Sequence, residues 1–183
     1  FEPSKKNYLK LSKKDLKLQK NFKTTIDISQ MGLGKKNEIL NLKEISDNGA
    51  SNTFNNYNPD SNYLKKKRFL TTFFGIKKFI DNEVPTEIIS LKKFLVNRHI
   101  EKIDFIKIDT EGFEFNILLG LGDYIKNVHF ISFEHHYDNM IIKNYNFKDI
   151  HKLLIDNGFE KIFKIKMPLR KSFDYIYQKK NFI

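Results

Sequence analysis

The sequence contains no cysteine, and this absence excludes several kinds of site at once. Disulfide bonds, metal sites built from thiolates and a cysteine nucleophile are all ruled out. The absence also fits a protein of a reducing compartment, and we expect a cytoplasmic location. No run of about 18 apolar residues occurs, so the sequence predicts no membrane-spanning helix. No segment repeats at the period of a solenoid.

Composition and charge narrow the class of protein further. The 183 residues are 40% apolar and 30% charged, which is typical of one soluble globular domain. Lys and Arg number 33 against 22 Asp and Glu, giving a net charge of +11, as in proteins that bind nucleic acid or anionic membranes. The basic residues are nevertheless spread along the whole chain, and only residues 64–69 (LKKKRF) are dense. We interpret them as a solvated surface, with a phosphate-contacting patch at 64–69 as the alternative.

The first half of the chain shows weak periodicity. Apolar residues at helical spacing predict a helix over residues 4–20, and Pro3 suits its start. Three strands are expected, at residues 22–28, 38–45 and 84–89. Ser90 is expected to cap a helix that ends near residue 98. Residues 46–68 are polar and without apolar periodicity, which predicts a binding loop or lid, or else a disordered segment.

The second half predicts most of a sheet. Residues 103–109 (IDFIKID) and 128–134 (VHFISFE) are nearly continuous apolar runs, typical of strands covered on both faces. Helical periodicity follows each run, over residues 110–122 and 147–157, before two aromatic-rich strands joined by MPLRKS. Because parallel neighbours need crossover connections, this alternation predicts a mostly parallel, doubly wound α/β sheet. The two last strands add a C-terminal antiparallel hairpin at one edge.

Acidic residues follow three of the expected strands. In an open parallel sheet, ligands bind beyond the carboxyl ends of the strands. The polar residues at these positions are Glu2, Asp109 with Glu111, and Glu134 with His135 and His136. We therefore expect three carboxylate-bearing strand ends to share one edge of the sheet.

The first two strand ends allow more than one interpretation. Glu2 fits an acid that accepts the ribose hydroxyls of a nucleotide, or else an exposed residue without a partner. Asp109 fits a cap of the following helix, a catalytic base, or both. Glu111 is more informative, because Gly112 beside it lets a ligand approach closely and packing does not require a Glu there.

The stretch FEHHYD contains residue types that bind divalent metals. Adjacent residues on a strand point to opposite faces, so Glu134, His135 and His136 do not all ligate one ion if the strand continues. Asp109 and Glu111 would add oxygen ligands, but we predict no metal site. The remaining interpretations are a single His, either His135 or His136, as base or substrate contact, and plain hydrogen bonding at a strand end.

Several stretches together resemble the FkbM family of S-adenosylmethionine-dependent methyltransferases. They occur in the family's order and are FEPSKKNYLKL, SQMGLGKKNE, GASNTF, VPTEIISLKKFL, IDFIKIDTEGFEFNILLGL, ISFEHH and LLIDNGFEKI. The family signature is a strand that ends Lys-x-Asp-x-Glu-Gly-x-Glu, and Lys107, Asp109, Glu111, Gly112 and Glu114 match it in full. The resemblance covers essentially the whole chain.

The resemblance implies a Rossmann-like class I methyltransferase fold in a single domain, residues 1–183, with S-adenosylmethionine as cofactor. It also implies that the first strand and its glycine-rich loop, which cradles the methionine part of the cofactor, are missing. Glu2 corresponds to the ribose-binding acid, Gln30 and Met31 line the adenine, and Asp109 lies beside the transferring methyl group.

The resulting hypothesis is methyl transfer to a hydroxyl oxygen of a sugar or another small metabolite. Alignment of the acceptor oxygen, the methyl carbon and the sulfur supplies roughly 7–11 kcal/mol, and a base adds about 10²–10⁴-fold. Asp109 and Glu111 are the first candidates for the base, followed by His135. The predicted acceptor contacts are Glu134, His136 and, from the lid, Asn52. We expect no membrane or nucleic-acid partner; the alternatives are a non-enzymatic RNA- or polyanion-binding module and an inactive methyltransferase-like fragment.

Overall fold

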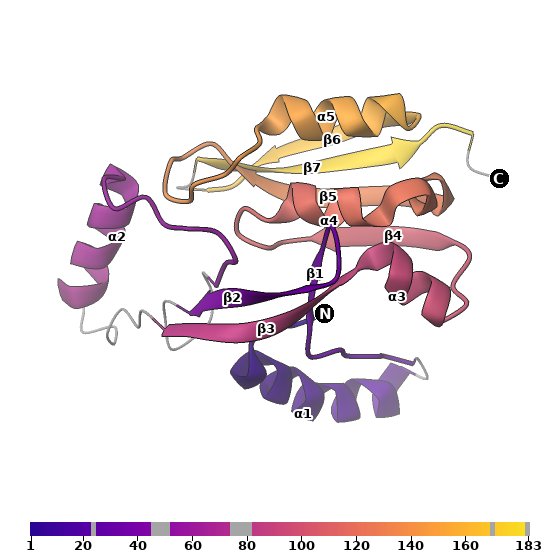
Figure 1. Cartoon of the computed structure of the whole chain (residues 1–183), viewed down its shortest axis with the longest axis horizontal. Helices are drawn as coiled ribbons and strands as arrows, with labels where there is room; N and C mark the ends of the chain where they lie inside the picture. The colour runs from indigo at the N-terminus through magenta and orange to yellow at the C-terminus, as the bar shows by residue number, and fades with distance from the viewer. Residues whose placement is uncertain (23–24, 45–51, 74–81, 169–170, 182–183) are drawn as a thin grey trace.

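The structure, a computed structural model of the chain, describes residues 1–22, 25–44, 52–73, 82–168 and 171–181, and it is a mixed α/β arrangement with two sheets (Figure 1). The helices are α1 (Lys5–Phe22), α2 (Asn62–Phe73), α3 (Leu91–Asn97), α4 (Glu114–Leu121) and α5 (Phe147–Asp156), with a 3₁₀ helix η1 (Gly122–Asn127). The strands are β1 (Gly32–Gly34), β2 (Glu38–Glu44), β3 (Asn82–Ser90), β4 (Ile103–Ile108), β5 (Val128–His136), β6 (Phe159–Lys166) and β7 (Ser172–Lys179).

The larger sheet has four strands in the order β4-β5-β7-β6. Strand β4 pairs parallel with β5, whereas β7 pairs antiparallel with both β5 and β6. Strands β4, β5 and β6 therefore run in one direction and β7 is reversed. This confirms the C-terminal hairpin. The sheet as a whole is mixed rather than mostly parallel as the sequence predicts, because only β4 and β5 pair in parallel.

The smaller sheet has three strands in the order β1-β3-β2, with β1 parallel and β2 antiparallel to β3. Helix α4 crosses β1 so closely that a Cβ atom on Gly120 would lie 2.0 Å from the carbonyl oxygen of Gly34. Only glycine fits at this crossing, because the opposing atom belongs to the backbone and cannot rotate away. The crossing joins the smaller sheet to the helices of the larger one.

The hydrophobic core lies on the face of the larger sheet that α4 and α5 cover (Figure 1). Strand alternation places Ile131 and Phe133 of β5 on this face, opposite Tyr177 and Tyr175 of β7. The core side chains from β5 and β7 are almost completely buried. The other face is less covered, since Phe105 is 53% and Phe163 57% exposed.

Local sequence signals place several elements correctly. Ser90 caps α3 by accepting a hydrogen bond from the backbone N–H of Lys93, as predicted. Helix α5 begins with a capping box between Asn146 and Asp149, and its buried residues Ile150 and Leu154 follow the predicted period.

Three expectations about the elements are wrong. Residues 22–28 were expected to form a strand, but α1 continues to Phe22 and residues 25–28 contain no strand. Residues 46–68 were expected to be without regular structure, but α2 begins at Asn62; residues 46–51 lie outside the described part. Strand β4 exists and forms an edge of its sheet, but it is not covered on both faces, because Asp104, Phe105 and Lys107 are exposed.

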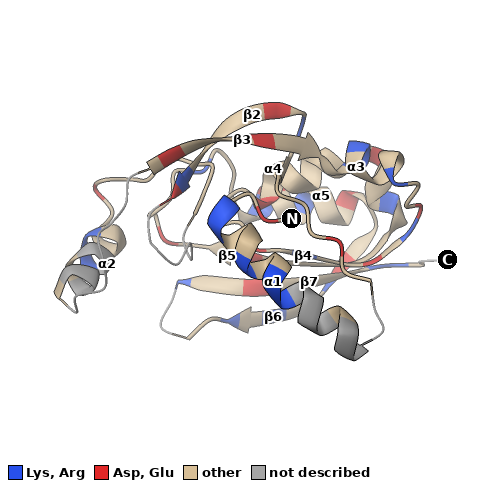
Figure 2. Ribbon diagram, turned by 90° about the horizontal axis from the view of Figure 1, so that it is seen from below, with Lys and Arg blue, Asp and Glu red and all other residues tan. Residues whose placement is uncertain are grey.

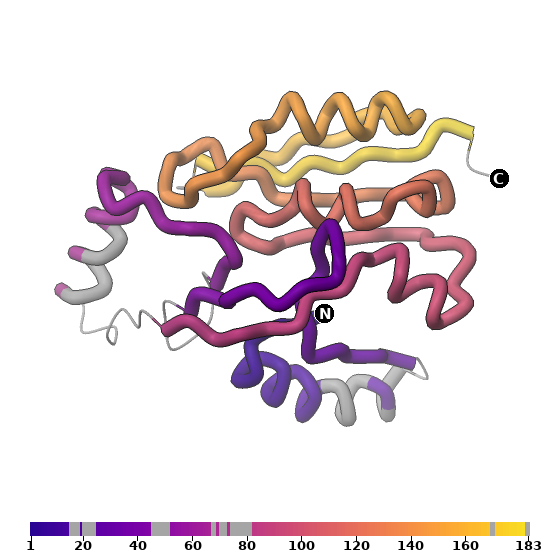
Figure 3. Tube along the Cα trace, in the orientation of Figure 1, coloured from indigo at the N-terminus to yellow at the C-terminus, as the bar shows by residue number. Residues whose placement is uncertain are grey.

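Basic residues are spread over several parts of the molecule. Lys and Arg colour α1, α2 and α3 and the loops between strands rather than one compact area (Figure 2). Helix α2 stands away from both sheets (Figure 3), and Phe1 at the start of the chain packs against Phe94 of α3. No helix in the described ranges combines the length and the apolar character needed to cross a membrane.

Candidate functional site

An apolar groove of about 1210 Å³ runs along the edge strand β4. Every residue of β4 lines it, and so do Asp109 and Thr110, which follow the strand. Apolar side chains of α3, including Leu91 and Phe94, form another wall. The groove therefore combines a long apolar interior with a carboxylate at the end of a parallel strand, where ligands of such sheets bind.

Glu2 lies just before α1, and its neighbours Phe1 and Pro3 line the groove. Its backbone N–H donates to the carbonyl of Ser29 at 3.0 Å, and its carboxylate accepts from the backbone N–H of Ser4 at 2.9 Å. Burial raises the pKa of Glu2 despite these hydrogen bonds. The structure thus gives Glu2 a fixed place beside the groove, so it is not an exposed residue without a partner.

Gln30 and Met31, expected together beside the cofactor, face two different cavities. Met31 lines the groove along β4, next to the Phe1 and Pro3 wall. Gln30 lines a second cavity of about 550 Å³, formed by the start of α1 and by strands β2 and β3. Only Met31 is therefore placed to contact a ligand of the main groove.

Asp109 is the carboxylate that lines the groove at the end of β4, whereas Asp104 lines it from within the strand. The residue is accessible to solvent, but its carboxyl group loses part of its hydration, which raises its pKa, and the charge of Glu134 raises it further. Asp109 does not cap α4, because the residue at the N-cap position is Phe113. The structure therefore removes the capping interpretation and leaves Asp109 at the wall of the groove.

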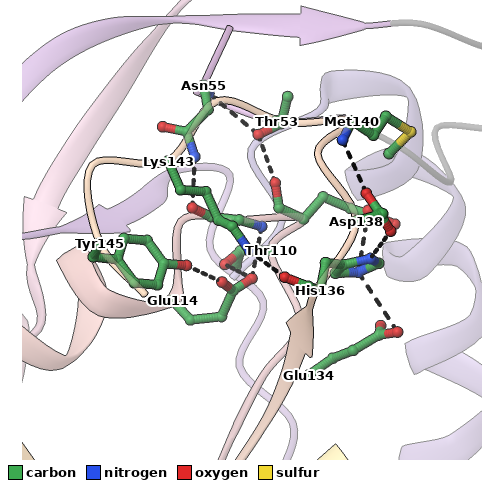
Figure 4. A network of polar contacts seen from close by, with 12 residues as sticks. Thr53, Asn55, Thr110, Glu114, Glu134, His136, Asp138, Met140, Lys143 and Tyr145 are labelled. Carbon is green, nitrogen blue, oxygen red and sulfur yellow. Dashed lines mark hydrogen bonds and ion pairs between the residues drawn. The ribbon is translucent and has the colours of Figure 1, made fainter. Parts of the chain in front are cut away.

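The loop after Asp109 has an unusual backbone. Glu111 has a φ of 49° and Gly112 a φ of 97°, a region that side chains disfavour. The buried carboxylate of Glu114 holds the loop, accepting from the backbone N–H of Gly112 at 2.8 Å and from the Thr110 hydroxyl at 3.2 Å (Figure 4). The Tyr145 hydroxyl donates to the other oxygen of Glu114.

His136 lies beneath this loop among three carboxylates (Figure 4). Its Nε2 atom is 3.5 Å from both Glu111 Oε2 and Glu134 Oε1, and its Nδ1 atom is 3.4 Å from Asp138 Oδ2. Burial alone would lower the pKa of His136, but Asp138, Glu134 and Glu111 outweigh it and raise the pKa to about 10. The imidazole is therefore a buried cation that holds Glu111 and Glu134 together.

His135 lies on the opposite face of β5. Its ring contacts Tyr137, Tyr145 and Phe147, with centroids 4.9 to 6.0 Å away. Burial lowers the pKa of His135 to about 3, with help from the charge of Lys143, so the ring is neutral. The structure does not bring His135 to Asp109, and it confirms that the adjacent histidines point to opposite faces.

The expected acceptor contacts are likewise divided. Glu134 and His136 are buried with Glu111 and do not line the groove. Asn52 lies at the start of a described stretch, and its Oδ1 atom is buried without a hydrogen bond from any described residue. No group of three or more His, Cys, Asp or Glu side chains in the described ranges is arranged to hold a metal ion.

Two residues that the sequence did not single out hold the loop from above. The Thr53 hydroxyl donates to the carbonyl of Glu111 at 2.8 Å, and the Asn55 side-chain amide donates to the carbonyl of Gly112 at 2.5 Å. The signal in the sequence was present but unspecific: a polar run, SNTFN, inside the expected lid.

Comparison with protein families decides the assignment. The model of the methyltransferase FkbM domain matches residues 1–161, which is most of the chain. The chain belongs to the FkbM methyltransferase family. No curated protein and no solved structure matches it. In this FkbM-family chain, the motif that carried the resemblance divides its carboxylates: Asp109 lines the groove, whereas Glu111 and Glu114 lie in the buried cluster.

Proposed function

We propose that the protein transfers the methyl group of S-adenosylmethionine to a hydroxyl oxygen of a sugar or another small metabolite. Membership of the FkbM methyltransferase family supports methyl transfer. The choice of S-adenosylmethionine as donor and a hydroxyl as acceptor rests on the groove along β4, which joins an apolar interior to the Asp109 carboxylate. An elongated ligand with an apolar base and a cationic centre suits these walls.

The residues of the groove fit the cofactor in three ways. Glu2 is held beside the groove, where its carboxylate is suited to accept hydrogen bonds from ribose hydroxyls. Met31 supplies an apolar contact for a base, and Asp109 supplies a negative charge for the sulfonium. When bound, S-adenosylmethionine supplies an electrophilic methyl group that needs no further activation.

Asp109 is the residue we assign as base. Partial desolvation raises the pKa of Asp109, and a carboxylate with a raised pKa accepts a proton from an acceptor hydroxyl more readily than an Asp of ordinary pKa. Glu111 is turned toward His136 at 3.5 Å and is suited to fix the loop rather than to contact the acceptor. Proton removal of this kind contributes about 10²–10⁴-fold to a rate.

We also propose the Rossmann-like completion of the larger sheet, in which a further strand and its glycine-rich loop lie against the edge of β4. The support is physical. Strand β4 forms an edge of its sheet, and Phe105 in the middle of this apolar strand is largely exposed. A partner strand would pair with the free backbone edge of β4 and occupy the stretch of groove along the strand, which leaves the end of the groove at Asp109 for the cofactor.

Calorimetric titration with S-adenosylmethionine tests the proposal. In a version of the chain that also carries this strand and loop, we expect saturable binding of one cofactor per chain, weakened at least tenfold by Glu2→Ala, because a hydrogen bond to a charged group contributes about 1.5–3 kcal/mol. Asp109→Asn should lower methyl transfer more than affinity. The matched control is Asp104→Asn, since Asp104 also lines the groove but lies within β4, away from the end of the strand. Undetectable binding, or equal effects at Asp104 and Asp109, would refute the assignment.

A further inference from the structure

Residues 52–58, here called the 52–58 segment, touch the backbone that follows Asp109. Thr53 and Asn55 donate to the carbonyls of Glu111 and Gly112, the two consecutive residues with positive φ. Positive φ is disfavoured for Glu111, which has a side chain, and persists only where neighbouring groups fix it. The hydrogen bonds from Thr53 and Asn55 fix this backbone on the side of the loop opposite His136 (Figure 4).

The 52–58 segment is itself fastened at both ends. The backbone N–H and carbonyl of Thr53 both bond to Lys43 of β2, at 3.2 and 2.9 Å. The backbone N–H of Asn58 donates to the carbonyl of Met140 at 2.9 Å, and that of Ile142 donates to the carbonyl of Asn56 at 2.8 Å. The segment therefore ties the smaller sheet to the loop after β5, across the end of β4.

The contact with the loop is tight. A Cβ atom on Gly112 would lie 3.2 Å from the amide nitrogen of Asn55 and 3.0 Å from a methyl of Ile141. Thr53 is only 1% exposed. Neither Thr53 nor Asn55 is among the described residues that line the groove, so neither would touch a ligand bound there.

We propose that Thr53 and Asn55 are positioning residues of the methyl-transfer site, which hold the carbonyls of Glu111 and Gly112 and thereby fix Asp109 against the groove. This inference rests on the proposed function. It gives the middle of the sequence-predicted lid a different role: the 52–58 segment is a fixed part of the site that acts through the backbone of the loop.

Two substitutions at Thr53 separate hydrogen bonding from packing. Thr53→Val keeps the shape and removes the hydroxyl, whereas Thr53→Ser keeps the hydroxyl and removes a methyl. A positioning role predicts that Thr53→Val weakens S-adenosylmethionine binding about tenfold, as expected for one lost hydrogen bond to a fixed group, while Thr53→Ser stays within about twofold. A purely structural role predicts the reverse order, because the buried methyl would then matter more.

A second pair tests Asn55. Asn55→Asp replaces the donating amide by an oxygen that faces the carbonyl of Gly112, and we expect at least a tenfold loss of cofactor affinity. Asn56→Asp is the matched control, since Asn56 accepts from Lys43 Nζ and an aspartate keeps that acceptor. Equal affinities for the two variants would overturn the proposal.

Hydrogen exchange at the Gly112 amide gives a readout that does not depend on the cofactor. Thr53→Val should speed exchange at Gly112 at least fivefold, and Thr53→Ser should not. If the unmodified chain bound no S-adenosylmethionine, the proposed function would fail, while this exchange pattern would still support the positioning of the loop. Unchanged exchange in Thr53→Val would overturn the inference even if the cofactor bound.

Discussion

Two environments meet at the end of β4, and they differ in burial and in the polarity of their side chains. On one side, the loop of residues 110–112 covers a buried polar cluster in which Glu114 is 1% exposed and hydrogen-bonded through both carboxylate oxygens. On the other side, the groove along β4 is apolar and leaves Phe105 53% exposed. The polar side chains of the cluster contact one another, whereas the groove exposes apolar surface.

The difference shows how one short motif serves two purposes. Asp109 faces the groove, whereas Glu111 and Glu114 face inward and hold the loop behind it. A carboxylate in a reactive site needs access to ligand, and its neighbours need to be fixed so that it keeps its orientation. If this division is correct, substitutions in the cluster should cost stability, and those of exposed side chains along the groove should cost little.

The largest effect is expected at Glu114. Glu114→Ala removes the acceptor of the Gly112 N–H, the Thr110 hydroxyl and the Tyr145 hydroxyl, and the first and last of these groups belong to buried residues. We expect the free energy of unfolding to fall by about 3–5 kcal/mol, measured by urea denaturation. Glu160→Ala, at an exposed residue of β6, is the control and should change it by less than about 0.5 kcal/mol. Similar losses for both variants would contradict the buried cluster.

A smaller effect with a characteristic pH dependence is expected at His136. Its pKa is raised to about 10 in the folded chain against an ordinary value near 6.5. The folded state then holds one proton more than the unfolded state between these values, so this stabilisation is complete below pH 6.5 and declines as pH rises to 10.

His136→Gln should lower the free energy of unfolding by about 2 kcal/mol at pH 7. The variant should also lose less stability than the unmodified chain between pH 7 and pH 10. Denaturation curves at pH 7, 8.5 and 10 measure both quantities. Parallel pH profiles for the two chains would show that His136 is not the buried cation among Glu111, Glu134 and Asp138.

The smallest effect is expected in the groove. Phe105→Ala should change the free energy of unfolding by no more than about 0.5 kcal/mol, because the ring is largely exposed. Ile108→Ala, on the same strand but with a side chain 3% exposed, should cost about 2–5 kcal/mol. Thermal denaturation of both variants compares the two sides of β4. A cost at Phe105 as large as that at Ile108 would mean that the groove is filled.

Local signals in the sequence predicted the elements around the site, but the long-range contacts could not be predicted from the sequence. The period of two in FEHHYD correctly separated His135 from His136, and Asp109 was correctly placed at a strand end. The edge position of β4 could not be read from IDFIKID, because an apolar run does not reveal how many neighbours a strand has. The bonds from Thr53 and Asn55 join residues 58 and 57 positions apart, and no local pattern encodes such pairs.

The most direct test of the central claim uses the methyl groups of the three methionines. Met31 lines the groove, whereas Met140 is buried in a separate cluster with Leu64 and Ile141. In spectra of the chain labelled with ¹³C at the methionine methyls, added S-adenosylmethionine should shift the Met31 signal saturably and leave the Met140 signal in place. A Met31 signal that does not move at saturating cofactor would contradict the account.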